Sequence, residues 1–277
     1  MKIKILSDST CDLPKNLLSE MNISTVPLTV VKGDVQFKDG VTITPAEIFD
    51  HVAQGGALCT TAANSIGEYE DMFAQYADWD GVILITIGSG FSACYQNATL
   101  AAEEFPNVRV VDSMNLSTGQ GLVVMKAWEL AKTATDLDQL AEEVRAYTAK
   151  IESSFLVEKL DYLVKGGRCS SAAALGANLL NLKPCIEVND GKMGVGKKYR
   201  GNYTKSLVTY VNERLEGRTD IERVFVTKTV VSDECFDAVM AAVRTHLQEE
   251  QILVSDAGCT VSCHCGPGTL GVLFVRK

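Results

Sequence analysis

The chain has 277 residues, with 26 Lys and Arg against 35 Asp and Glu, a formal charge of -9 and 46% hydrophobic residues. This composition is typical of a soluble globular protein and excludes a disordered one, and the acidic balance predicts no nucleic-acid partner. No apolar stretch approaches the ~20 residues of a membrane helix, and the N-terminal apolar run ends at Asp8, too early for a signal peptide. We therefore expect a cytoplasmic protein without a transmembrane segment, in which the nine cysteines are reduced thiols.

Short apolar runs alternate with helical patterns through the first half of the chain, an order typical of parallel strands joined by crossover helices. Strands are predicted over residues 3–6, 23–31, 82–87 and 108–111, a hairpin turn at 32–34, a loop over 60–64, and helices over 93–104, 122–134 and 136–150. Capping boxes predict that two more helices begin after Thr44 and Ser65, because each hydroxyl residue has a Glu three positions later.

The pattern changes near residue 155, where glycine turns begin to separate strand-like runs. Asn189-Asp190-Gly191 between two such runs predicts a β-hairpin and therefore antiparallel strands. Further strands are predicted over 224–226, 252–254 and 271–275, with helices over 203–216 and 236–248. The predicted fold is α/β, with a parallel-sheet, Rossmann-like domain over 1–155 and an α+β domain over 156–277 that has a mainly antiparallel sheet and flanking helices.

The segment 88–93 follows a buried strand and precedes a helix, so its backbone N–H groups and the hydroxyls of Ser89 and Ser92 can face an anion. The partial positive charge of a helix N-terminus favours a carboxylate or phosphate there. An ordinary strand-to-helix turn also needs a glycine and a capping serine, so the spacing alone leaves a purely structural role open.

Asp8 ends the first predicted strand, within the polar loop 7–10. An aspartate in this position can coordinate Mg²⁺ in some phosphotransfer folds. The Asp-x-Asp spacing typical of such enzymes is absent from the sequence. We therefore favour a structural role, in which the carboxylate accepts hydrogen bonds from loop N–H groups.

His264 stands in a cysteine-rich segment, 259–265, just before a Gly-Pro-Gly turn. Thiolates and imidazole are zinc ligands, but a strand would place His264 opposite Cys263 and Cys265, and no second ligand pair follows at zinc-finger distance. We favour an imidazole that donates a hydrogen bond to an anion, with a buried structural histidine as the alternative.

Arg168 lies on a glycine-rich turn ahead of a helix rich in alanine and leucine, and its planar guanidinium suits a carboxylate or phosphate. The usual dinucleotide, P-loop and hydrolase signatures are absent from the sequence. With only three histidines, a serine or cysteine nucleophile has few possible bases, so the sequence supplies little for catalysis.

Five segments, 7–13, 88–96, 111–113, 166–168 and 264–271, together resemble the DegV family in order and spacing over nearly the whole chain. The resemblance implies a long-chain fatty acid bound between two α/β domains. For some members it also implies a non-catalytic carrier subunit of a bacterial fatty acid kinase, which presents the acyl carboxylate to a separate ATP-dependent kinase subunit. No metal and no cofactor other than the bound fatty acid are implied.

The resemblance also assigns site residues. It implies that the fatty-acid carboxylate contacts Thr61, Ser89 and His264, with Ser92 nearby. Arg168 is the implied contact for the kinase subunit or the phosphorylated headgroup, and Arg200 is a second candidate for that contact.

Two loops depart from the family pattern. The family's Thr-Ser-Gln-Pro-Ser is Thr-Ala-Ala-Asn-Ser at 61–65, and its Ser-Ser-Gly-Leu-Ser-Gly-Thr is Gly-Ser-Gly-Phe-Ser-Ala-Cys at 88–94. These changes remove two hydroxyl donors and add a bulky ring, so headgroup geometry or chain preference is expected to differ. An alternative of another class is a small-molecule transferase or hydrolase that uses Asp8, Ser89 and His264.

Overall fold

The computed structural model describes residues 1–173 and 182–277, and in this part of the chain the strands form three sheets. The first is a parallel sheet in the order β2-β1-β6-β7. Its strands are β1 (Ile3–Asp8), β2 (Ser24–Val26), β6 (Gly81–Thr86) and β7 (Val108–Asp112). Their carboxyl ends meet at one edge, which is where α/β proteins bind ligands.

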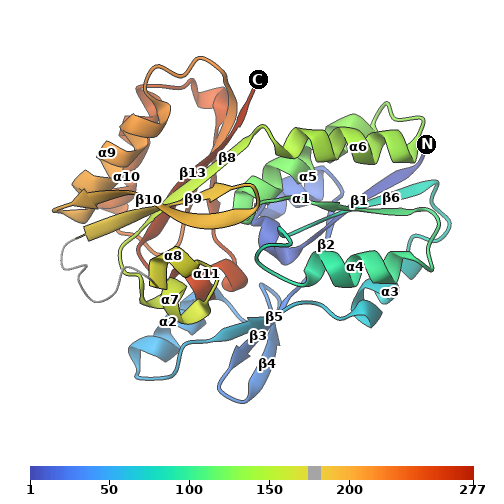
Figure 1. Ribbon diagram of the computed structural model, residues 1–277, viewed down its shortest axis with the longest axis horizontal. Helices are drawn as coiled ribbons and strands as arrows, with labels where there is room; N and C mark the ends of the chain where they lie inside the picture. Colours follow the sequence, from blue (N-terminus) through green and yellow to red (C-terminus); the bar gives the residue numbers. More distant parts are fainter. Residues whose placement is uncertain (174–181) are drawn as a thin grey trace.

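Helices cover both faces of this sheet, which confirms the parallel α/β arrangement (Figure 1). One face carries α3 (Ile66–Ala74) and α4 (Cys94–Ala102); the other carries α1 (Lys15–Glu20), α5 (Ser117–Ala131) and α6 (Leu137–Thr148). The central strand β6 is buried at every position, as its continuous apolar run predicts. Both predicted capping boxes are present, at the start of α3 and of α2 (Pro45–Ala53).

A six-stranded sheet forms most of the second half, in the order β10-β9-β8-β13-β11-β12. Its strands are β8 (Ile151–Val157), β9 (Leu182–Asn189), β10 (Lys192–Arg200), β11 (Ile221–Lys228), β12 (Ile252–Asp256) and β13 (Thr269–Arg276). Every pair is antiparallel except β11 with β12. Helices α9 (Tyr203–Leu215) and α10 (Asp233–Arg244) pack on one face, so the mainly antiparallel α+β prediction is confirmed.

A small sheet and three short helices lie beside the two larger sheets (Figure 1). The sheet has the order β4-β3-β5, from β3 (Thr29–Lys32), β4 (Val35–Lys38) and β5 (Thr60–Ala62). The helices are α7 (Asp161–Gly166), α8 (Ser170–Ala173) and α11 (Cys259–Cys265). The alanine- and leucine-rich helix predicted after Arg168 begins as α8, and its expected continuation over 174–181 lies outside the described residues.

Four local predictions are wrong. The single strand expected over 23–31 is two strands in different sheets, broken at Pro27, which has no N–H to donate. Residues 60–62 form strand β5 instead of a loop, and the helix expected from 122 already begins at Ser117. The segment 259–265, considered above as a strand, is helix α11.

We call residues 1–150, with β1–β7 and α1–α6, the first unit, and the described residues from 151 onward the second unit. We keep 1–155 and 156–277 as proposed domains; strand β8 crosses that boundary. The units share an apolar core, because Phe225 and Val275 pack into the cluster that covers one face of the parallel sheet. Hydrogen bonds between buried side chains also join them: Thr118 to Thr227 at 2.6 Å and Ser153 to Asn115 at 2.6 Å.

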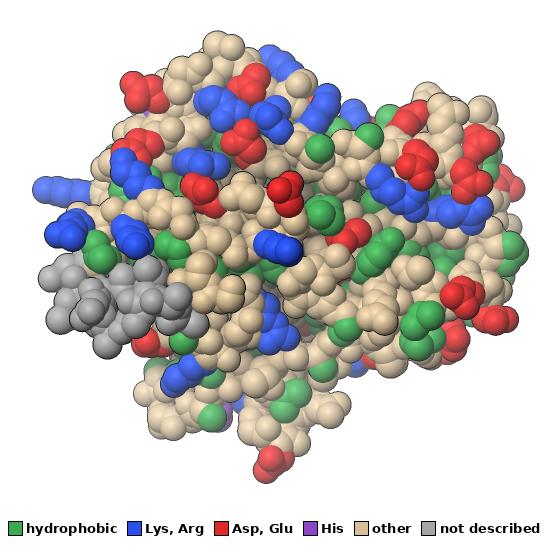
Figure 2. Space-filling model, in the orientation of Figure 1, with side chains coloured by type: hydrophobic (Ala, Val, Ile, Leu, Met, Phe, Trp, Pro, Cys, Tyr) green, Lys and Arg blue, Asp and Glu red, His purple; other side chains and the backbone are tan. Residues whose placement is uncertain are grey.

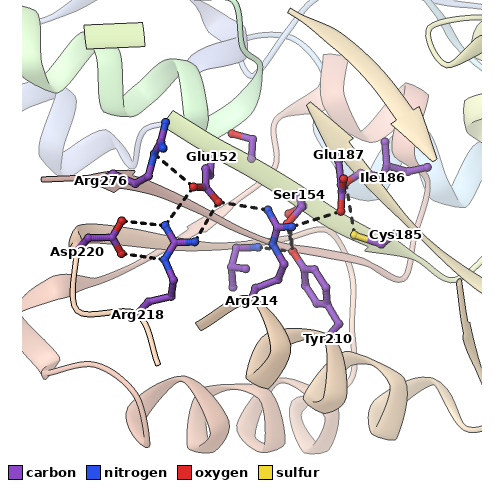
Figure 3. Close-up of polar contacts among 12 residues, drawn as sticks. Glu152, Ser154, Cys185, Ile186, Glu187, Tyr210, Arg214, Arg218, Asp220 and Arg276 are labelled. Carbon is purple, nitrogen blue, oxygen red and sulfur yellow. Dashed lines mark hydrogen bonds and ion pairs between the residues drawn. The ribbon is translucent and has the colours of Figure 1, made fainter. Parts of the chain in front are cut away.

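An ion-pair network surrounds Glu152 on the second sheet (Figure 3). Arg218, Arg276 and Arg214 reach its carboxylate with N–O distances of 3.1, 3.3 and 3.6 Å. Asp220 pairs with Arg218, and Glu187 with Arg214, so the charges balance within the network. Figure 2 likewise shows acidic and basic side chains interspersed over the visible face. Within the described residues, no helix combines the length and apolar character needed to cross a membrane.

Candidate functional site

A pocket lies where β5 and the loop after β6 meet helix α11 of the second unit. It encloses about 510 Å³ of space, part of which is open to solvent. Most of its lining is apolar and comes from both units, including Leu28, Ile87, Phe91, Leu116, Met193 and Val261. The polar side chains that line it are those of Thr61, Ser92, Arg168, Thr260 and His264. A mostly apolar space with a few polar groups in its lining suits an amphipathic ligand.

Thr61 and His264 meet at this pocket although 203 residues separate them, and Thr61 Oγ1 lies 2.8 Å from His264 Nε2. Thr61 is held by β5, in which it pairs with Val30 of β3. His264 occupies the last turn of α11. The family resemblance implied both residues as carboxylate contacts, and only the folded chain brings them together.

The His264 ring is neutral near pH 7. Burial, and then the positive charge of Arg168, lower the pKa of His264 to about 4. Its Nδ1 is buried and has no hydrogen-bond partner among the described residues. A proton on the buried, unpartnered Nδ1 would be an orphaned N–H, so we assign the one ring proton to Nε2, which then donates to Thr61 Oγ1. The Thr61 hydroxyl is then free to donate its own proton to an acceptor in the pocket.

Arg168 lies at the mouth of the pocket, just beyond the end of α7. Gly167 caps the helix: its φ of 68° is left-handed, and its N–H donates to the Leu163 carbonyl at 3.1 Å. The Arg168 side chain is exposed, and its Nη1 donates to the Gly166 carbonyl at 2.6 Å. The guanidinium therefore keeps donors available for an anion at the mouth.

Of the two serines in the loop after β6, only Ser92 lines the pocket. Its hydroxyl accepts a hydrogen bond from the Cys94 amide at 3.3 Å, at the start of α4. Ser89 is exposed and lies outside the lining, and its amide donates to Asp112 at 3.1 Å. Arg200, at the end of β10, is also exposed and outside the lining.

Asp8 is fully buried beneath the pocket loop. Its carboxylate accepts hydrogen bonds from the Ile87 amide at 2.7 Å, from Gln120 Nε2 at 2.9 Å, and from the amide and hydroxyl of Thr10. Burial raises the pKa of Asp8, and these hydrogen bonds oppose the rise. Of the trio Asp8, Ser89 and His264, only His264 lines the pocket, and the contacts of Asp8 fit the structural role.

A second apolar space shares Leu116, Val261 and Cys265 with the pocket described above. It takes in about 330 Å³, part of which is open to solvent. Its far side is formed by Phe155 of β8 and Leu273 of β13. Sequence reasoning named no residue that lines the apolar space, Leu116 and Val261 included, and it treated the segment that carries Val261 as a strand. In a helix, Val261 and Cys265 are four positions apart and share a face, and this spacing was the available signal.

The whole chain resembles proteins of one family. A family model described as an uncharacterised protein of the DegV family matches residues 2–277. A DegV domain-containing protein from Clostridium acetobutylicum is 33% identical, covering 100% of this chain and 99% of that protein. A solved structure described as the fatty acid binding of a DegV family protein from Thermus thermophilus has a TM-score of 0.88 at 32% identity, over 100% of both chains. Another, described as a stearic acid-binding protein from Eubacterium ventriosum, has a TM-score of 0.85 at 28% identity, covering 99% of this chain and 98% of that one.

Proposed function

The chain belongs to the DegV family, and on this premise we propose that it binds a long-chain fatty acid, with the carboxylate at Thr61 and His264 and the tail in the apolar space between the units. The descriptions of the Thermus thermophilus and Eubacterium ventriosum proteins, which name fatty acid and stearic acid binding, support this ligand class.

The observation that carries the proposal is the Thr61–His264 pair in the lining of a largely apolar pocket. A neutral imidazole that donates to Thr61 leaves the threonine hydroxyl to donate to a carboxylate oxygen. Ser92, also at the pocket, has a hydroxyl that donates to Cys94 Sγ at 3.1 Å. In this proposal that hydroxyl rotates to donate to the carboxylate and takes the place that the resemblance gave to Ser89. Contact of Ser89 with the headgroup stays a prediction.

Burial of the acyl tail supplies most of the binding free energy in this proposal. Each CH₂ group that leaves water contributes ~0.8 kcal/mol, so an acyl chain of roughly sixteen carbons can offset the loss of freedom on binding. The chain runs from the headgroup past Leu116 and Val261 into the second apolar space. Headgroup contacts then fix the depth at which the chain sits.

Native mass spectrometry of the purified protein, followed by delipidation and titration, tests this function. We expect a bound fatty acid and saturable rebinding. Replacing His264 with Ala should weaken fatty-acid affinity by about tenfold to hundredfold, because Thr61 loses the imidazole that directs its hydroxyl toward the carboxylate. A fatty alcohol of the same length measures the contribution of the tail alone and should respond much less. Absence of saturable fatty-acid binding would contradict the proposal.

We further propose that the protein is a non-catalytic carrier, which presents the carboxylate to a separate ATP-dependent kinase subunit for acyl-phosphate formation. The absence of a P-loop signature from the sequence and the exposed Arg168 at the pocket mouth support this step. A guanidinium there can pair with a phosphorylated headgroup, and Arg200 is a second exposed contact for the kinase.

Replacing Arg168 with Ala tests the carrier step. Fatty-acid affinity should stay within a few-fold of the parent, while acyl-phosphate formation with a DegV-partner kinase should fall sharply. Arg244→Ala is the matched control, since Arg244 is an exposed arginine of α10 that pairs with Glu249. Lost lipid binding with unchanged phosphorylation per bound lipid would instead assign Arg168 to the headgroup pocket.

A further inference from the structure

Two buried aspartates of the first unit contact the N-terminus of α11, the second-unit helix that carries His264. Asp39 accepts hydrogen bonds from the amides of Cys259 and Thr260, at 2.8 and 3.2 Å. Asp12 accepts one from the amide of Gly258 at 2.9 Å. These three consecutive N–H groups belong to the end of a helix that leaves its first amides without intrahelical partners.

The helix has no cap of its own. Its N-cap residue is Gly258, which has no side chain, and its first turn contains no acidic residue. A Cβ on Gly258 would lie 2.8 Å from Asp12 Oδ1, so the close approach of the carboxylate requires glycine here. The oxygens that cap the helix thus come from residues 246 and 220 positions away in sequence.

Both carboxylates are themselves held in place. Ser9 donates to Asp39 Oδ2 at 2.9 Å, and Ser117 donates to Asp12 Oδ2 at 2.5 Å. The Ser255 hydroxyl adds a hydrogen bond to the backbone carbonyl of Asp12. Asp39 and Asp12 are only 4% and 7% exposed. Because Ser9 and Ser117 also hold their carboxyl groups, the two aspartates can fix the position of the amides that they bind.

We propose that Asp12 and Asp39 are positioning residues for the headgroup site, which hold α11 so that His264 meets Thr61. The inference rests on the proposed fatty-acid function. A helix of seven residues is marginal by itself, so tertiary contacts hold it in place. Its buried side chains pack into two apolar clusters, and the two aspartates fix its N-terminal end. Cys259 and His264 are only about 7.5 Å apart along the axis of α11, so a shift of its capped N-terminal end also moves the imidazole.

Asp39→Asn tests the proposal, because it keeps the shape but turns an NH₂ group toward one of the two amides. In the delipidated full-length protein, we expect fatty-acid affinity to fall about tenfold and affinity for the matching fatty alcohol to stay within about twofold. Combined with His264→Ala, Asp39→Asn should have no further effect on fatty-acid affinity. Asp136→Asn is the matched control, since Asp136 caps α6 through the Gln139 amide at 2.9 Å, on a helix that does not line the pocket.

A second readout does not depend on any ligand. NMR titration of the His264 ring, assigned with His264→Gln, should show its pKa moving from about 4 toward the ordinary value in Asp39→Asn, because a displaced ring gains solvent. If Asp39→Asn fails to fold, Ser9→Ala removes one support of Asp39 and should produce smaller changes in the same direction.

The possible failures are distinguishable. Equal losses for acid and alcohol, additive effects with His264→Ala, or an unchanged His264 titration would overturn the positioning role while fatty-acid binding by the parent stands. A parent protein that binds no fatty acid would overturn the proposed function, and the His264 titration would still decide whether the two aspartates position the ring.

Discussion

Gly166→Ala asks whether the headgroup site depends on the position of the His264 ring. A Cβ on Gly166 would lie 2.5 Å from His264 Nδ1, about 0.9 Å short of an ordinary 3.4 Å contact. On its other side the ring is hydrogen-bonded to Thr61 at 2.8 Å. A ring shift of that size either lengthens this bond past roughly 3.5 Å or presses the two atoms together, and both outcomes disturb the donor arrangement.

Gly166→Ala is expected to weaken fatty-acid binding without a comparable loss in the free energy of unfolding. Loss of headgroup support costs about 1–3 kcal/mol of binding free energy, which is a tenfold to hundredfold weaker fatty-acid affinity. Gly166 ends α7 without a positive φ, so alanine there is compatible with the backbone and gains up to about 1 kcal/mol of helix propensity. The free energy of unfolding of the ligand-free protein should therefore stay within about 1 kcal/mol of the parent.

Gly167→Ala supplies the opposite pattern. Gly167 has a φ of 68°, but a Cβ there meets no atom within 4 Å. Alanine should lower the free energy of unfolding by about 1 kcal/mol through backbone strain and leave fatty-acid affinity unchanged. Displacement of a fluorescent fatty acid and denaturant unfolding measure the two quantities. Parent-like affinity in Gly166→Ala, or equal affinity losses in the two variants, would refute the reasoning.

Three further changes probe other contacts of the site. A Cβ on Gly90 would lie closer to the Gly191 carbonyl than real Cβ atoms approach a neighbour, so Gly90→Ala should loosen the β9–β10 hairpin and speed hydrogen exchange in it, while Gly67→Ala, which meets nothing, should not. The pKa of His264 is lowered from 6.5 to about 4 in the folded protein, so between pH 4 and pH 6.5 the unfolded chain binds more protons than the folded one. The contribution of the neutral ring to the free energy of unfolding is therefore complete above pH 6.5 and is lost as the pH falls toward 4. The free energy of unfolding of the parent minus that of His264→Gln should accordingly decrease from pH 7 to pH 4, and a constant difference would contradict the lowered pKa. Val261 lines both apolar spaces, so on the proposed path of the tail Val261→Phe should shorten the longest acyl chain that binds, as measured with fatty acids of increasing length; an unchanged length limit would place the tail elsewhere.

Sequence reasoning succeeded where a local pattern determines the structure. The apolar run of β6 needs both faces covered, and the Ser65 capping box fixes the start of α3. The Asn189-Asp190-Gly191 turn also forms as predicted, because Asp190 and Gly191 both adopt positive φ, which that sequence tolerates. In each case the residues that specify the element lie within a few positions of one another.

The prediction failed for α11, where distant residues decide the structure. Its sequence of cysteine, threonine, valine, serine and histidine has low helix propensity, so nothing local indicates a helix. The same limit applies to the two serines of the β6 loop. Which hydroxyl faces the pocket depends on the path of the turn, and spacing alone did not separate Ser92 from Ser89.

The dependence of α11 on the first unit links ligand binding to the docking of the two units. Thr61 belongs to one unit and His264 to the other, so their hydrogen bond exists only when the units are docked. The helix that presents His264 is in turn capped by Asp12 and Asp39 across the same junction. A ligand that binds this pair binds only the docked state, and at a concentration of 100 Kd it would stabilise that state by about 2.7 kcal/mol. The affinity for the acyl chain, the capping of α11 by Asp12 and Asp39, and the docking of the two units are therefore linked in one equilibrium.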